Sequence, residues 1–358
     1  MSWYGIDAID KAVSRTRRAL FEPFDLWKWV KLAIIIFFLG SGSSNYTGSG
    51  NNYRMSPGEL RNTTNLGSDL IHGYIPQSIN SPITSFSEYG LLIALIAALI
   101  LIFLLFFYIS SVMEFVFVES LVKNEVKFWA YSRKFLGRGF NLLLVRLALL
   151  IIFLVFLGIA ALPLISSIMK TSSDFSWPAL MGGFVWFIGV LIALGLIMGI
   201  IRSFISLAIP VSIYRNMGLI ASLKLVFANF RKSWRQVLVY WVIRFVLGLV
   251  VGILIVILFL LLLVALGIIF GIIDVVLYYI FTSFVSDPMR WIFLIPFIII
   301  ELLLFLGIML LINVPFAVFL KYQLLSFLEA WFAGADIPFF DAPASGTEIG
   351  LSESQPTI

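Results

Sequence analysis

The chain contains no cysteine among its 358 residues. Disulfides, thiol nucleophiles and thiolate-bound metal clusters are therefore excluded, while the redox compartment is left open. The single histidine, His72, cannot build a histidine metal cluster. Charged residues make up only 12% of the chain, against roughly 25% in a typical soluble domain. These absences favour a protein that holds no metal and no cofactor.

Apolar residues are abundant instead. They form 61% of the chain, and the mean hydropathy is +1.07. No soluble core could bury so much apolar surface, so the composition predicts an all-α, polytopic integral membrane protein. The polar first 27 residues lack the features of a cleavable signal peptide, so the first span is expected to act as the insertion signal. The apolar runs predict about six transmembrane helices, near residues 27–40, 89–118, 141–169, 178–213, 236–270 and 291–320.

One stretch of sequence recurs along the chain. Residues 219–228 (LIASLKLVFA) align with residues 324–333 (LLSFLEAWFA), and in both copies a proline stands nine residues upstream, Pro210 and Pro315. Similar basic amphipathic stretches precede the spans near residues 27 and 141. The pattern predicts three repeated hairpins, joined by amphipathic helices that lie at the membrane interface. In this interpretation the prolines bend the chain out of the membrane, and residues 322–334 form the last interfacial helix.

The apolar stretch at 236–284 is too long for one straight span. As a single helix it would be about 70 Å long, more than twice the roughly 30 Å hydrocarbon core. We expect one span to about residue 270, followed by an interfacial or re-entrant segment at 274–284. Two spans joined by a tight hairpin are the alternative, which would make seven.

Lysine and arginine are concentrated in three segments, 1–27, 119–140 and 214–235. With six spans, the positive-inside rule places these segments and both termini in the cytoplasm of a multi-pass cell-membrane protein. The domain organisation is then one transmembrane domain at 1–334, including an external polar loop at 41–88. An acidic cytoplasmic tail at 335–358 is expected to be disordered. Two sequons in the loop make Asn45 and Asn62 candidate glycosylation sites.

Three cations lie just inside predicted spans, at Lys31, Arg146 and Arg244. At this depth a long side chain can extend its charged group to the headgroup region, so interfacial anchoring is the simplest interpretation. The alternative is a ring of three cations that binds anionic lipid headgroups or an anionic solute.

Arg202 and Glu301 lie deeper, each about ten residues inside a span. A charge at mid-membrane costs at least ~2.5 kcal/mol, and pairing inside the bundle is the simplest compensation. We therefore expect a buried ion pair between Arg202 and Glu301. It could be structural, or it could serve coupling or permeation.

Signatures of enzymes are not found in the sequence. It has no Gly-x-Ser-x-Gly elbow, no His-Glu-x-x-His motif and no clustered carboxylate pair. The sequence therefore predicts a protein that is not an enzyme and has no catalytic residues.

The basic-aromatic run at 230–234 (FRKSW), ahead of a span, resembles a group of uncharacterised prokaryotic polytopic membrane proteins. The group is related to the membrane domain attached to some glycerophosphoryl diester phosphodiesterases. The resemblance covers most of the chain but includes no catalytic residues, and the soluble phosphodiesterase domain is missing here, so that activity is not implied. The two sequons and the polar loop would suit an archaeal surface.

Two functions stay open at this point. The first is a non-catalytic membrane protein that organises lipid or assembles with a membrane partner, supported by the interfacial helices. The second is a transporter or channel for a lipid or small anion that uses Arg202 and Glu301. Expected partners are membrane lipids with anionic headgroups, and a membrane protein or a second copy of the chain; no nucleic acid is expected.

Overall fold

The computed structural model describes residues 4–40, 85–169, 177–284, 286, 289–332 and 337–341. These residues form eight α-helices and no sheet, which confirms the all-α prediction. The helices are α1 (Tyr4–Leu20), α2 (Leu26–Gly40), α4 (Ser85–Val122), α5 (Phe128–Met169), α6 (Trp177–Tyr214), α7 (Leu219–Lys232), α8 (Trp234–Phe284) and α9 (Met289–Trp331). The predicted glycosylation sites Asn45 and Asn62 lie outside the described residues.

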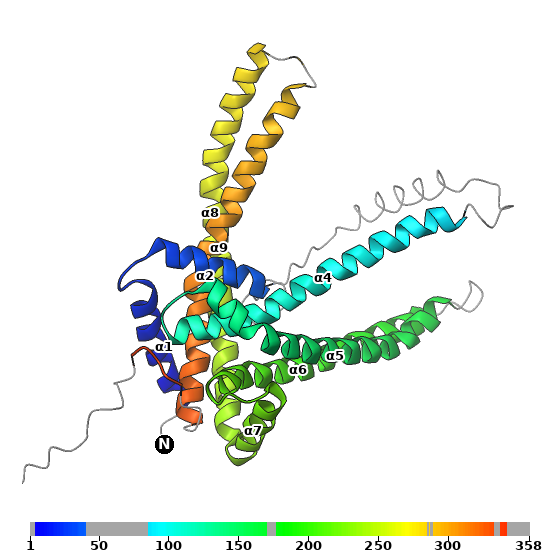
Figure 1. The fold of residues 1–358 in the computed structure, drawn as a ribbon. Helices are drawn as coiled ribbons and strands as arrows, with labels where there is room; N and C mark the ends of the chain where they lie inside the picture. Colours follow the sequence, from blue (N-terminus) through cyan, green and yellow to red (C-terminus); the bar gives the residue numbers. More distant parts are fainter. Residues whose placement is uncertain are drawn as a thin grey trace, which may run out of the picture.

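Three arms diverge from a shared base (Figure 1). One arm is α4, the second is the α5/α6 hairpin and the third is the α8/α9 hairpin. The base consists of α1, α2, α7 and the ends of the long helices that meet them. The buried residues are concentrated there, in residues 110–122 of α4, the end of α6 and the second half of α9. The helices therefore pack against one another mainly in the base, while the arms extend away from it.

Among the described residues, five helices are long and apolar enough to cross a membrane, namely α4, α5, α6, α8 and α9. The chain is thus a membrane protein. The predicted span at 27–40 corresponds to α2, which has 15 residues, fewer than the roughly 20 that span a hydrocarbon core. One face of α2 is buried against α4 and α9 through Leu32, Ile35 and Leu39. A sixth span at this position stays a prediction.

The long helices are more continuous than the sequence predicts. Residues 274–284 are not a separate interfacial segment, because α8 is a single helix of 51 residues. At 1.5 Å per residue it is about 76 Å long, more than a bilayer core requires. Its first turns lie in the base, where Val237 and Tyr240 are fully buried. Part of the excess length is therefore used for packing in the base.

The helix does not end at Pro315, and the predicted bend there stays a prediction. Pro315 lies inside α9, which continues to Trp331. Residues 322–328 are not at an interface, because all of them are buried in the base. A proline removes only one backbone hydrogen bond, which a packed helix can tolerate when its neighbours hold it in place. Likewise, α5 already begins at Phe128, so its basic first turns are continuous with the span.

Stacked aromatic rings, and a close contact between two helices at a glycine, stabilise the base. Tyr240 of α8 stacks on Phe327 of α9 with ring centroids 4.1 Å apart, and Phe115 of α4 stacks on Phe135 of α5 at 5.7 Å. Gly139 of α5 lies so close to α4 that a Cβ atom there would be 2.4 Å from a side-chain methyl group of Val112. The inner ends of the arms thus interlock at near-contact distances.

Candidate functional site at the base

A buried charge cluster lies where the arms meet. Glu114 of α4 forms an ion pair with Arg146 of α5, which also donates a hydrogen bond to Ser111 Oγ at 3.2 Å. The ammonium group of Lys321 of α9 is 3.8 Å from the other Glu114 carboxylate oxygen. The side chains of Glu114 and Lys321 are 3% and 0% exposed, respectively. This carboxylate therefore joins three helices that belong to three different arms.

Arg244 of α8 completes the cluster. It donates hydrogen bonds to the backbone oxygen of Leu320 and to Gln323 Oε1, both at 3.3 Å, and to the Tyr240 hydroxyl at 3.2 Å. The charges of Arg146 and Arg244 both act on Lys321. Glu114 thus contacts two of the three cations of the cluster, and Arg244 lies beside Lys321. Because a buried charge is costly unless it is paired or hydrogen-bonded, Arg146 and Lys321 depend on Glu114.

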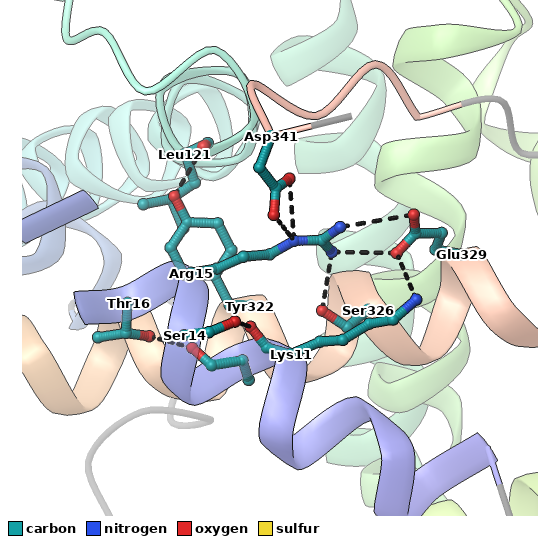
Figure 2. Close-up of polar contacts among 10 residues, drawn as sticks. Lys11, Ser14, Arg15, Thr16, Leu121, Tyr322, Ser326, Glu329 and Asp341 are labelled. Atoms are coloured by element: carbon teal, nitrogen blue, oxygen red, sulfur yellow. Dashed lines mark hydrogen bonds and ion pairs between the residues drawn. The ribbon is translucent and has the colours of Figure 1, made fainter. Parts of the chain in front are cut away.

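A second polar junction attaches the N-terminal helix to α9, centred on Arg15 (Figure 2). The Arg15 guanidinium is 3.0 Å from Glu329 and 3.0 Å from Asp341, and it donates a hydrogen bond to Ser326 Oγ at 2.9 Å. Only 6% of the Arg15 side chain is exposed. Charge-assisted hydrogen bonds of this kind are about twice as strong as neutral ones, so Arg15 holds α1 firmly in the base.

Residues 337–341 cross this junction. Ile337 and Phe339 are buried, and the Phe339 ring lies 3.6 Å beneath the Arg15 guanidinium carbon. The backbone amide of Phe340 donates a hydrogen bond to the Val122 carbonyl oxygen at 3.0 Å, at the end of α4. From the sequence, these residues are expected to belong to a disordered tail. For these five residues that expectation is wrong, because their alternating apolar side chains are packed against α1 and α4.

Glu119 of α4 is, like Glu114, a buried acid of the base. Its carboxylate accepts hydrogen bonds from Lys134 at 2.9 Å and from the Tyr214 hydroxyl at 3.3 Å, and it pairs with Lys123 at 2.8 Å. The hydrogen bond with Glu119 raises the pKa of Lys123 above its usual value. Glu119 therefore links α4 to α5 and α6, beside the cluster that contains Glu114.

The helix α7 presents a different kind of surface. Its inner face is buried against α6 through Leu219, Ser222 and Val226. The outer face bears exposed apolar and basic side chains together, among them Ile220 and Phe227. At the start of α7 there is a pocket of about 180 Å³, lined by residues of α5, α6 and the loop between α6 and α7. One of them is Arg138, whose side chain donates a hydrogen bond to Asn216.

Two of the three shallow cations singled out in the sequence come together. Arg146 and Arg244 both belong to the buried cluster around Lys321. Lys31 lies elsewhere, with its ammonium group 5.7 Å from the Trp27 ring centre on α2. The third cation of the cluster is Lys321, which sequence reasoning missed. A lone lysine directly after a long apolar run was the available signal.

The two deeper charges lie on different arms, Arg202 on α6 and Glu301 on α9. The Glu301 carboxyl group interacts with that of Asp274, on the neighbouring helix α8. The expected ion pair between Arg202 and Glu301 stays a prediction.

The described residues include no group of three or more histidine, cysteine, aspartate or glutamate side chains that could hold a metal ion. The buried acids are instead engaged with lysines and arginines, as the contacts of Glu114 and Glu119 illustrate. These contacts stabilise the junction of the helices.

The fold and the base define a polytopic helical membrane protein with diverging arms. Within that class, the chain belongs to a family of unknown function (DUF7544), which it matches over residues 3–337. No curated protein and no solved structure matches the chain.

Proposed function

We propose that this protein acts without catalysis in the cell membrane, where it organises lipid or assembles with a membrane partner. The observation that carries this proposal is the exposure of the apolar side chains of the arms. In the most apolar stretch of each candidate span, at most 6% of the residues are buried within the molecule. A transporter needs an enclosed path, whereas these faces are free to contact lipid, a membrane protein or a second copy of the chain.

The base supports the same proposal. Glu114 joins the inner ends of α4 and α5, and Arg15 joins α1 to α9, so buried ion pairs fix the arms at their inner ends. The resemblance to a membrane domain without catalytic residues agrees with it. In this proposal both termini and the base lie on the cytoplasmic side, next to the anionic headgroups of that leaflet.

Because the chain has no cysteine, single cysteines can test the proposal directly. Leu261 of α8 and Val185 of α6 are strongly exposed, and the fully buried Val318 of α9 is the matched control. We expect Leu261→Cys and Val185→Cys to react in native membranes with a lipid-soluble thiol reagent or to crosslink to a neighbour, while Val318→Cys does neither. Labelling by a charged, water-soluble reagent along one face of an arm would refute the proposal.

Transport of a lipid or small anion is the second candidate function. It is favoured by the polar contact between Glu301 and Asp274 within an arm. The variants Arg202→Gln and Glu301→Gln and their combination test it through thermal stability in detergent. If the two residues pair, the double variant is no less stable than either single variant. Water accessibility of cysteines at 202 and 301 would then favour transport over scaffolding.

A further inference from the structure

We propose that the outer face of α7 binds the anionic headgroups of the lipid leaflet next to the base. The inference rests on the proposed membrane function and deepens it, because it assigns the lipid contact to one surface and one headgroup chemistry. We define the α7 face by exposed residues of α7 and of the first turn of α8, namely Ile220, Lys224, Phe227, Arg231, Lys232, Trp234 and Arg235.

The position of α7 is fixed by the chain on both sides. It follows α6 after four residues and is separated from α8 by Ser233 alone. Both neighbours are candidate membrane spans, so α7 must lie where they leave the membrane. Its end is also attached to α9, because the Trp331 indole donates a hydrogen bond to Ser233 Oγ at 2.7 Å. The helix is thus held at the boundary between hydrocarbon and water.

The α7 face combines apolar and cationic side chains at helical spacing. Ile220, Lys224, Phe227 and Arg231 follow one another at intervals of three and four residues, which places them on one side of the helix. Ile220, Phe227 and Trp234 are 63%, 51% and 49% exposed. Phe227 also contacts Phe204 of α6, with ring centroids 6.0 Å apart, so this face lies beside a membrane span. Such a face suits shallow insertion between headgroups.

The cations of the α7 face also lack acidic neighbours. Residues 215–235 contain no aspartate or glutamate. Among the described residues, no ion pair involves Lys224, Arg231, Lys232 or Arg235, whereas Lys11, Lys123 and Lys134 are all paired with glutamates. Several basic side chains of the base are thus neutralised by glutamates, whereas the four cations of the α7 face form no ion pair among the described residues. An anionic lipid surface is the complementary partner for four unneutralised cations beside apolar anchors.

The test uses the full chain in a mild detergent, titrated with dioctanoyl phosphatidylglycerol and, in parallel, with dioctanoyl phosphatidylcholine. Binding is followed by tryptophan fluorescence, because Trp234 lies on the α7 face. The test variant carries Lys224→Gln, Arg231→Gln, Lys232→Gln and Arg235→Gln. A control variant removes the same charge at four exposed positions elsewhere, through Arg17→Gln, Arg18→Gln, Lys127→Gln and Arg133→Gln.

We expect the test variant to bind phosphatidylglycerol at least ~10-fold more weakly, since each cation near an anionic surface contributes roughly a factor of five. The control variant should bind as the wild type does, and salt at about 1 M should remove the preference. Equal weakening in both variants, or equal binding of phosphatidylcholine, would overturn the proposal. Unchanged binding of phosphatidylglycerol by the test variant would overturn it as well. The arm-labelling experiment is independent, so the two proposals can fail separately.

Discussion

The charge cluster at the base predicts very different effects on stability for substitutions of two of its members. Removing the carboxylate with Glu114→Gln leaves Arg146 and Lys321 buried without their counter-charge. Breaking a buried ion pair in this way costs about 3–5 kcal/mol. Lys321→Met instead removes one of three gathered cations and keeps a side chain of similar length in a fully buried position. The Glu114–Arg146 pair remains, so we expect a change within about 1 kcal/mol.

These free energies can be measured as melting temperatures. At about 2 °C per kcal/mol, Glu114→Gln should lower the melting temperature by roughly 6–10 °C, and Lys321→Met should leave it within about 2 °C. Circular dichroism and tryptophan fluorescence in detergent both apply, because the chain has ten tryptophans. The transition reports mainly on the base, where the buried residues are concentrated. The reasoning is refuted if Lys321→Met is as damaging as Glu114→Gln, or if neither variant melts differently from the wild type.

Three further predictions concern the base. Gly139→Ala should destabilise the protein by about 1–3 kcal/mol, because its new Cβ overlaps α4. Gly137→Ala places its Cβ in open space and should stabilise the protein by about 0.5–1 kcal/mol. The melting temperatures of the two variants should therefore move in opposite directions. Asp341→Asn should expose α1 to limited proteolysis more readily than the wild type, because Arg15 then loses one of two carboxylates; unchanged cleavage would contradict this. Lys123→Gln should lower stability at neutral pH. Since pairing raises the pKa of Lys123 above 10.5, this contribution is present below that pH and disappears as pH rises through the folded-state pKa, which melting curves across alkaline pH can check.

The sequence predicts the helical class and the long apolar helices well, because composition and run length determine both. It predicts continuity poorly. Pro210 and Pro315 stand at matching places in the two aligned stretches, yet α6 ends four residues after Pro210 while α9 continues 16 residues beyond Pro315. A proline disfavours helix locally, and only tertiary packing decides whether the helix resumes. That packing cannot be seen in the local pattern.

The same limit applies to the apolar stripe that the two aligned stretches share. The stripe indicates that one side of each helix is buried, but not whether the opposite side faces solvent or protein. In α7 the opposite side is exposed, and Lys224 points away from the base. At the aligned position of α9 stands Glu329, which binds Arg15 of α1. The change of charge between the copies therefore reflects a change of partner. That partner, Arg15, is recognised only from the position of α1 in the structure.

The central position of α9 has a consequence for how the molecule is made. α9 is the last of the described helices, yet α1, α2 and α8 all pack against it. During synthesis the arms can enter the membrane one after another, but α1 has no Glu329 to bind until more than 300 residues later. Assembly of the base must therefore wait for the final helix, and until then the basic α1 remains available to chaperones or to the lipid surface.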